Sequence, residues 1–386
     1  MPPEHSTVPG NVSDPVNQAI LTVSEDRLAG FQEDPFDAIA HQSGVPVDTV
    51  IERIAAMLRS GAIRRIRQTM MSTNLAKGSL VAWQVPHDRL DAAFDYMFQD
   101  DPFSGHVVIR TTDSQTPGSN YRLWTTLKVP QGYSIGKHAA LLARKVGAER
   151  FRLMPAKIVF ALGVGHVRRK GIEPGARADV MAEPKNTAIV ELSDLEWNIL
   201  TSLKREFEPE ELRRDLWSAR ASEAGVTLDE FFRVAHNLNA RRVIGRFSTF
   251  LEHVKPVNNE RVTRYNALFH WAVPLGREMD AGREIGRHFI ITHAYWREGG
   301  PEFKGVNIMA VAHGMEKPMV LAHKAAIDGH LREAGIDFGY TNVFWGGRSE
   351  IKPSEISPMA YRDFCTRHGV DPVTMLAEHE DEGEKL

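Results

Sequence analysis

The sequence has a single cysteine, Cys365, in 386 residues. One cysteine excludes an intramolecular disulfide and any cysteine-rich metal site, and such scarcity is typical of proteins of the reducing cytoplasm. Long apolar runs are also absent, since no window approaches the ~20 apolar residues that a membrane helix needs. Residues 1–11 are polar and contain proline, so they are not expected to form a signal peptide. We therefore expect a cytoplasmic protein with no membrane partner.

Neither sign of charge is in clear excess. Lys and Arg number 47 against 50 Asp and Glu, for a formal net charge of −3. A chain so nearly neutral has no general attraction for polyanions, so binding to nucleic acid would need a local basic patch. With 42% apolar and 25% charged residues, the composition is that of a soluble globular protein long enough for several domains.

The sequence does contain a long internal repeat. The spacing H-x3-R-x9-N occurs twice, at His106, Arg110 and Asn120 and again at His293, Arg297 and Asn307. Residues 82–86 (AWQVP) likewise correspond to residues 270–274 (HWAVP). Self-similarity at so long a period indicates a duplicated domain rather than a solenoid. Beyond the repeated Asn the copies differ, because the second has His313 where the same spacing gives Thr126 in the first.

Each copy is predicted to begin with a helix-turn-helix. In the first copy Gly44 marks the turn before an amphipathic helix over 47–59, and in the second the last helix is expected over 228–238. The order strand, helix, strand, strand, helix, strand follows in both copies and is typical of the ferredoxin-like fold. The predicted fold class is α+β, a tandem duplication of a helix-turn-helix module plus a ferredoxin-like βαββαβ module.

The same patterns divide the chain into six segments. They are a helix-turn-helix module (14–66) and a ferredoxin-like module (67–162) in copy 1, a linker (163–189), a helix-turn-helix module (190–247) and a ferredoxin-like module (248–352) in copy 2, and a C-terminal extension with a charged tail (353–386).

Several short segments, taken in order, resemble the siroheme decarboxylases, an enzymatic branch of the Lrp/AsnC-like superfamily. They are SGAIRRIR from residue 60, NALFHWAVP from 266, THAYWRE from 292 and NIMAVAHG from 307. The resemblance covers roughly residues 14–369. It implies an enzyme that converts acetate side chains of siroheme to methyl groups, giving didecarboxysiroheme in haem or haem d1 biosynthesis. It also implies an internal pseudo-dimer, with a further homodimer left open, and no cofactor or metal beyond the iron tetrapyrrole substrate.

The implied reaction needs a proton donor. Loss of carbon dioxide leaves electron density on the exocyclic carbon, and histidine can supply a proton near neutral pH. Strand alternation places His293, Tyr295 and Arg297 on one face. By the same alternation Asn307 and His313 share a face of the next strand. We therefore expect His293 and His313 to be the catalytic pair, with the second copy as the working one.

A substrate with many carboxylates also needs cations, and the planar guanidinium of arginine binds carboxylate bidentately. The two arginines of the repeat are the strongest candidates, followed by those at the junctions between modules and after the last strand. The substrate-binding candidates are Arg297, Tyr295, Asn307, Arg246, Arg110, His106, Arg64, Arg65 and Arg348.

Two other functions remain open. A transcription regulator would use the helix-turn-helix modules on DNA and sense a ligand with the ferredoxin-like modules. However, the helices over 47–59 and 228–238 carry acidic residues in numbers similar to basic ones, which does not favour phosphate contact. A non-catalytic tetrapyrrole carrier would keep the arginines and need no proton donor.

Overall fold

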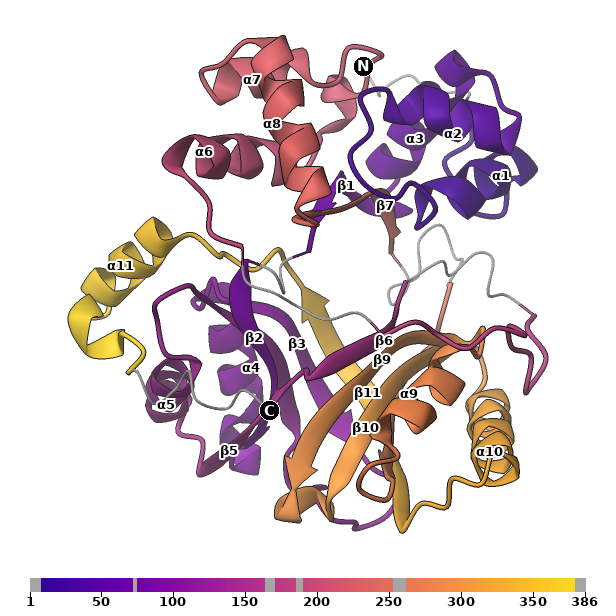
Figure 1. Ribbon diagram of the computed structural model, residues 1–386, viewed down its shortest axis with the longest axis vertical. Helices are drawn as coiled ribbons and strands as arrows, with labels where there is room; N and C mark the ends of the chain where they lie inside the picture. Colours follow the sequence, from indigo (N-terminus) through magenta and orange to yellow (C-terminus); the bar gives the residue numbers. More distant parts are fainter. Residues whose placement is uncertain (1–7, 72–74, 164–170, 185–189, 253–261, 379–386) are drawn as a thin grey trace. The chain divides into compact units, whose positions relative to one another are not determined.

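The computed structural model describes residues 8–71, 75–163, 171–184, 190–252 and 262–378. Its contacts divide the chain into two compact units, and each unit combines segments from both copies. The helical unit comprises residues 1–72, 163–171 and 190–264, and the sheet unit comprises residues 73–162, 172–189 and 265–386. The helix-turn-helix segments of both copies thus belong to one unit and the ferredoxin-like segments of both copies to the other, although they alternate along the chain (Figure 1).

The helical unit contains both predicted helix-turn-helix modules. Its elements are α1 (Pro15–Ser24), α2 (Pro35–Ser43), α3 (Val47–Arg59) and β1 (Ile63–Met70) from the first copy, and α6 (Asp194–Lys204), α7 (Ser218–Glu223), α8 (Leu228–Ala240) and β7 (Ile244–Leu251) from the second. Gly44 ends α2 with a φ of 72°, a conformation that glycine adopts without a steric cost. Strands β1 and β7 pair antiparallel, which joins the two copies.

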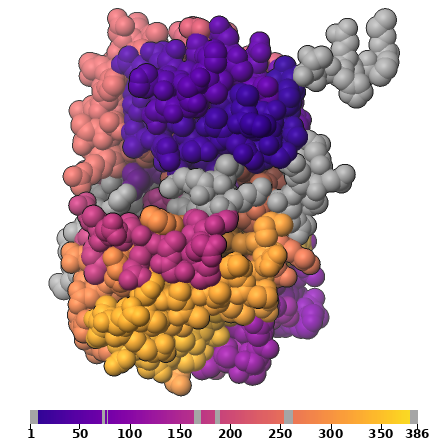
Figure 2. All heavy atoms as spheres, turned by 90° about the vertical axis from the view of Figure 1, so that its right-hand side faces the viewer, coloured from indigo at the N-terminus to yellow at the C-terminus, as the bar shows by residue number. Residues whose placement is uncertain are grey.

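Residues of the two modules also pack directly against each other. The rings of Phe31 and Trp217 lie 5.4 Å apart, and two ion pairs join α3 to the second copy, Asp48 with Arg214 at 3.0 Å and Arg59 with Glu210 at 3.5 Å. On the face of the helical unit in Figure 2, the first-copy helices form a continuous surface. The α3 helix is therefore engaged with the second copy through its exposed charged residues.

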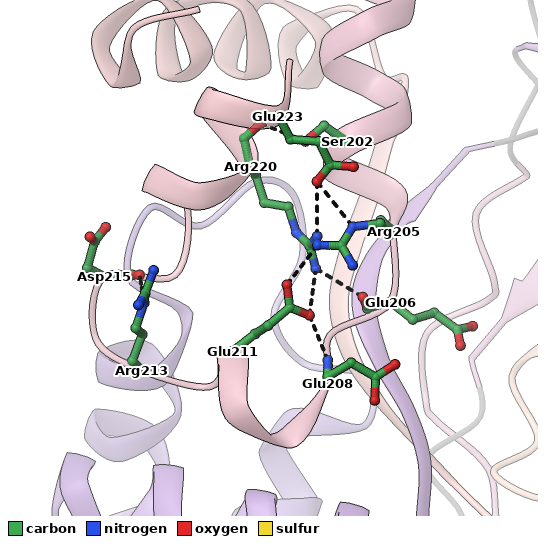
Figure 3. A network of polar contacts seen from close by, with 9 residues as sticks. All are labelled: Ser202, Arg205, Glu206, Glu208, Glu211, Arg213, Asp215, Arg220 and Glu223. Atoms are coloured by element: carbon green, nitrogen blue, oxygen red, sulfur yellow. Dashed lines mark hydrogen bonds and ion pairs between the residues drawn. The ribbon is translucent and has the colours of Figure 1, made fainter. Parts of the chain in front are cut away.

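A buried arginine organises the second module of the helical unit. Arg220 in α7 is 0% exposed and donates to the carboxylates of Glu211 and Glu223, each at 3.2 Å, and to the main-chain oxygen of Glu206 at 3.0 Å (Figure 3). Its guanidinium also lies 4.4 Å from the centre of the Phe207 ring. These contacts hold the segment between α6 and α7 against α7.

The sheet unit contains both predicted ferredoxin-like modules. The first copy supplies β2 (Ala76–Gln84), α4 (Leu90–Gln99), β3 (Ser104–Thr111), β4 (Leu123–Pro130), α5 (Ile135–Val146), β5 (Arg150–Pro155) and β6 (Ile158–Leu162). The second supplies β8 (Tyr265–Ala272), α9 (Glu278–Gly286), β9 (Ile291–Gly300), β10 (Val306–Gly314), α10 (Lys317–Glu333) and β11 (Tyr340–Ile351). The predicted α+β duplication is confirmed.

The last strands of each copy pair with both copies. The nine-stranded order is β5-β2-β4-β3-β11-β8-β10-β9-β6. The first part of β11 pairs with β8 and its second part with the first-copy strand β3, while β5 pairs with β2 and β6 with the second-copy strand β9. Each copy was predicted to have one strand after its last helix, but that of the first copy is divided into β5 and β6 after Pro155, which has no N–H to continue a ladder.

Each sheet half has an outer and an inner face. Helices α4 and α5 cover the outer face of the first copy, and α9 and α10 cover that of the second (Figure 1). The inner faces pack together around Trp124, Phe303 and Phe344, with 5.4 Å between the rings of Trp124 and Phe344. Ala82 of β2 and Leu268 of β8 belong to the same cluster. The two copies therefore share one core on the inner sheet face.

The C-terminal extension belongs to the first-copy core. In α11 (Pro358–Arg367), Tyr361 and Phe364 are fully buried in the cluster beneath α4 and α5. The hydroxyl of Tyr361 lies 3.1 Å from Nδ1 of His138, whose Nε2 lies 3.3 Å from the Asp101 carboxylate. The charged tail from residue 379 and parts of the predicted linker lie outside the described residues. In the described part of the chain, no helix has the length and apolarity to cross a membrane.

Candidate active site

A row of polar side chains crosses five neighbouring strands of the inner sheet face. Gly346 of β11 is the register partner of Arg110 on β3 and of Asn266 on β8, and Asn266 is in turn paired with His313 on β10. Arg110 donates from Nη1 to Oδ1 of Asn266 at 3.2 Å, and Nδ2 of Asn266 lies 3.2 Å from Nε2 of His313. Nδ1 of His313 then lies 3.5 Å from the hydroxyl of Thr292 on β9.

Gly346 makes this row possible. A Cβ atom at this position would lie 3.2 Å from the Cβ atom of Asn266 and 3.3 Å from its main-chain oxygen, tighter than ordinary contacts. Because the glycine has no side chain, the long side chain of Arg110 can extend past β11 to reach Asn266. This links a residue of the first copy to the candidate catalytic strand of the second.

His293 stands at the other end of the row. Its Nδ1 lies 3.1 Å from the Thr292 hydroxyl, so the two candidate histidines both contact one threonine. The His293 ring stacks on Tyr295 with 6.2 Å between centroids and 17° between planes. The Arg297 guanidinium lies 4.3 Å from the centre of the Tyr295 ring. The structure therefore brings His293, His313, Tyr295 and Arg297 together, as their shared strand faces predicted.

Both arginines of the repeat reach a late strand of the opposite copy, β11 for Arg110 and β5 for Arg297. Arg110 donates to the main-chain oxygen of Phe344 at 3.4 Å, and Arg297 donates to that of Met154. Burial lowers the pKa of Arg110 to about 9 and also lowers that of Arg297. With a pKa of about 9, Arg110 remains a cation at neutral pH, and its burial strengthens its attraction for an anion.

The histidine and arginine of the repeat occupy matching positions in the two copies, but the asparagine does not. His106 and His293 pair with Ile351 and Leu162, the late strands of the opposite copies. Asn120 is exposed before β4, whereas Asn307 lies within β10. The x9 spacing therefore does not reflect a shared position for the asparagines.

The cross-strand register also shows that Thr126 is not the first-copy equivalent of His313, as the sequence spacing had suggested. Thr126 pairs with His106, while the partner of His293 is Val311. His313 instead matches Lys128, which pairs with Gly78 as His313 pairs with Asn266. His106 itself contacts the hydroxyl of Ser349 at 2.9 Å. The first copy therefore has neither the histidine nor the asparagine of the polar row.

Asn307 was expected among the substrate ligands, but its amide has a structural role. It accepts from the main-chain N–H of Val273 at 2.8 Å and donates to the oxygen of the same residue at 2.9 Å. The amide also donates to the carboxylate of Glu278 at 3.2 Å, and Asn307 is 5% exposed. These bonds join the end of β8 to the start of α9. They satisfy the main-chain N–H and C=O of Val273, which need hydrogen-bond partners when buried.

Arg348 is also placed away from the polar row. The bulge between Gly346 and Ser349 changes the alternation of β11, and the Arg348 guanidinium pairs with Asp91 at 3.1 Å and with Asp95, both on α4. It lies 4.1 Å from the centre of the Phe94 ring. Because α4 covers the outer sheet face, Arg348 lies on the opposite face from the polar row, and its role in substrate binding stays a prediction.

The three remaining candidates, Arg64, Arg65 and Arg246, lie in the helical unit. Arg65 is buried, pairs with Glu206 at 3.4 Å and lies 5.2 Å from the centre of the Phe250 ring. Arg246 donates to the main-chain oxygen of Glu25 at 3.3 Å. Arg67, which was not among the predicted site residues, lies close to all three. Burial and these neighbouring arginines lower the pKa of Arg67 to about 10. Their roles as substrate contacts stay predictions.

Sequence reasoning missed two residues of the inner face. Asn266 and His270 lie on β8, where the first copy has Gly78 and Ala82 at the corresponding positions of β2. His270 is 0% exposed, and neither ring nitrogen has a hydrogen-bond partner among the described residues. A residue-by-residue comparison of the two copies could have found both differences.

One group outside the polar row has the residue types of a metal site. Ligand atoms of Glu284, His288 and His330 lie within 4.8 Å of one another. Arg287 pairs with Glu284 at 2.9 Å, and Arg177 contacts both Glu284 and His330. The carboxylate charge that would attract a metal cation is therefore already balanced by guanidinium groups.

Comparisons with known proteins agree with this architecture. The family model for the AsnC-like ligand binding domain matches residues 75–160. The crystal structure of the siroheme decarboxylase NirDL has 18% identity and a TM-score of 0.64, covering 91% of this chain and 97% of that one. The structure of the same enzyme in co-complex with an iron-uroporphyrin III analogue has 18% identity and a TM-score of 0.62, covering 92% and 99%. No curated protein matches in sequence. The chain shares the fold of NirDL over nearly its full length.

Proposed function

We propose that this protein is a siroheme decarboxylase that converts acetate side chains of siroheme to methyl groups, giving didecarboxysiroheme in haem or haem d1 biosynthesis. The observation that supports it most is the inner-face site, where two histidines share Thr292, and the buried Arg110 and the half-buried Arg297 approach from opposite copies. The co-complex of NirDL with an iron-uroporphyrin III analogue supports an iron tetrapyrrole as the ligand class.

The residues have distinct roles in this proposal. Arg110 and Arg297 hold substrate carboxylates, since burial strengthens charge-assisted hydrogen bonds. The acetate carbon–carbon bond breaks, carbon dioxide leaves, and the electron pair stays on the exocyclic carbon, where the macrocycle delocalises it. His293 or His313 then delivers one proton to that carbon and completes the methyl group. The iron tetrapyrrole is the substrate, and no further cofactor enters the reaction.

Anaerobic incubation of the purified protein with siroheme, followed by mass analysis of the tetrapyrrole, tests the proposal. The expected result is the stepwise loss of two carbon dioxide units, with multiple turnovers for each protein molecule. Siroheme recovered unchanged but bound to the protein would indicate a carrier instead. Siroheme recovered unchanged and unbound would contradict tetrapyrrole chemistry altogether.

The regulator alternative makes a different prediction for DNA. In α3 the basic residues are already paired, Arg53 with Asp14 at 3.0 Å and Arg59 with Glu210 at 3.5 Å. Phosphate contact would have to break these pairs, and the chain has no net positive charge to compensate. We expect no salt-sensitive duplex binding at micromolar protein in a fluorescence anisotropy titration. Specific binding at physiological salt would favour the regulator.

A further inference from the structure

We propose that Asn266 is a positioning residue that holds the neutral ring of His313 in its Nδ1–H tautomer. The inference rests on the proposed function for its effect on turnover, but its structural content is independent of the substrate. It follows from the direction of the hydrogen bonds in the row that links Arg110, Asn266 and His313.

The first step is the orientation of the Asn266 amide. An asparagine amide can be flipped, because its oxygen and nitrogen have nearly the same shape. A guanidinium only donates, so the atom 3.2 Å from Nη1 of Arg110 has to be the amide oxygen. Arg110 is itself fixed, since it is 4% exposed and also donates to the main-chain oxygen of Phe344. The amide nitrogen therefore points toward His313.

The second step is the tautomer of His313. The Asn266 amide nitrogen can only donate, and it lies 3.2 Å from Nε2 of His313. Nε2 must then be the acceptor, so a neutral ring carries its proton on Nδ1. That nitrogen faces the hydroxyl of Thr292 at 3.5 Å, and the same hydroxyl contacts Nδ1 of His293 at 3.1 Å. The Thr292 hydroxyl donates its own hydrogen to the main-chain oxygen of Val311 at 3.1 Å, so the proton of His313 is directed at the threonine oxygen that both candidate histidines contact.

The duplication supports a specific role for this asparagine. The first copy has Gly78 at the position of Asn266, and Gly78 pairs with Lys128 rather than with a histidine. The fold therefore does not require an asparagine here. Gly346 provides the space through which Arg110 reaches the amide, so the whole arrangement depends on residues from both copies.

The tautomer can be measured directly on the full chain without substrate. Imidazole nitrogen shifts from ¹⁵N-labelled protein distinguish an Nδ1–H from an Nε2–H ring, and the His313 signals are assigned by their loss in His313→Gln. The wild type should show the Nδ1–H form of His313. Asn266→Gly, which copies the first module, should lose this preference. Asn266→Asp, which keeps the shape but presents an acceptor, should move the proton to Nε2.

The controls separate positioning from general structural damage. Asn342→Gly removes an asparagine from the adjacent strand, where its amide donates to Thr116 at 2.7 Å, and should leave the His313 tautomer unchanged. An Nε2–H ring in the wild type, or an unchanged Nδ1–H ring in Asn266→Asp, would overturn the proposal. If Asn266→Gly fails to fold, Asn266→Asp still decides the question.

Turnover provides the link to function. In the decarboxylation assay Asn266→Gly should lower kcat at least about 10-fold, the scale of a lost supporting contact, with a smaller change in KM. Unchanged kcat together with a changed tautomer would overturn the catalytic part of the proposal. If the wild type has no decarboxylase activity, the proposed function fails, and the tautomer measurement still tests the role of Asn266.

Discussion

His293 and His313 differ from His106 in their contacts, although His106 and His293 are repeated residues. The two second-copy histidines share the hydroxyl of Thr292, whereas His106 contacts Ser349 and pairs with Thr126. We expect His293→Ala and His313→Ala each to reduce decarboxylation about 10²-fold or more, the usual scale for a lost general acid. His106→Ala should have a smaller effect.

Steady-state turnover with siroheme checks this prediction, with a binding titration to show that each variant still takes up the ligand. The comparison assigns the working site to one copy. If His106→Ala abolished turnover while His313→Ala stayed near wild type, the site would lie in the first copy.

His270 should make stability depend on acid pH. Burial, followed by the charge of Arg110, lowers its pKa to about 3 from an ordinary value of 6.5. As pH falls below about 6.5, the unfolded chain takes up a proton that the folded chain excludes. This group therefore favours unfolding increasingly until the pH approaches 3, by at most about 1.4 kcal/mol per pH unit.

Replacing this ring with an apolar one should remove the effect. His270 lies 4.8 Å from Phe344 between ring centroids and has no hydrogen-bond partner among the described residues, so His270→Leu leaves no donor or acceptor stranded there. Urea unfolding at pH 7 and at pH 5 should show a smaller loss of stability in the variant than in the wild type. An equal loss in both would show that His270 does not carry this dependence.

At the scale of elements, the stability of the second helix-turn-helix module depends on Arg220. Its side chain is 0% exposed, and removing it takes away the donor to the main-chain oxygen of Glu206 and the buried one of the two guanidinium groups that pair with Glu211 and Glu223 (Figure 3). Arg220→Ala should destabilise the protein by about 1.5–3 kcal/mol, the range for a lost hydrogen bond to a charged group.

Arg205 provides a matched comparison. It pairs with the same two residues, Glu211 at 2.7 Å and Glu223 at 3.1 Å, but its side chain is 45% exposed. Water screens these pairs, so Arg205→Ala should cost no more than about 1 kcal/mol. Thermal unfolding of both variants measures the difference, and equal shifts in Tm would argue against burial as the cause.

The sequence patterns predicted elements better than contacts between elements. The helices predicted over 47–59 and 228–238 begin and end within two residues of α3 and α8. The pairing of β11 with β3 and of β6 with β9 could not be predicted. The alternation of apolar and polar residues along a strand shows which face is buried, but it does not show which strand of the other copy lies beside it. The bulge in β11 likewise turned Arg348 toward α4, and a single inserted residue is enough to reverse a strand face.

In the candidate site, too, the positions of residues along one strand were predicted, but contacts between strands were not. Alternation along β9 correctly grouped His293, Tyr295 and Arg297. The contacts of Asn307 were not foreseen, because alternation does not reveal that its amide closes the end of β8. Asn266 was missed because its importance depends on Arg110, which lies far away in the sequence.

At the scale of the whole molecule, the two copies complete each other's sheets. The first half contributes β6 to the second-copy strand β9, and the second half returns the end of β11 to β3. In the helical unit β1 pairs with β7. Either half alone would therefore expose several unpaired strand edges, which are prone to associate with other chains.

We therefore expect that fragments 1–184 and 190–386 do not fold as monomers when each is produced alone. Each fragment should be unfolded or self-associated by analytical ultracentrifugation, because its edge strands lack partners. Produced together, they should form a one-to-one complex that melts in a cooperative transition and recovers the Arg110–Asn266 contact between halves. Asn266→Gly in the second fragment should leave this assembly intact, because the cross-copy ladders and the cluster around Trp124, Phe303 and Phe344 join the halves without this side chain. A folded monomer of either fragment would show that the cross-copy ladders are dispensable for folding.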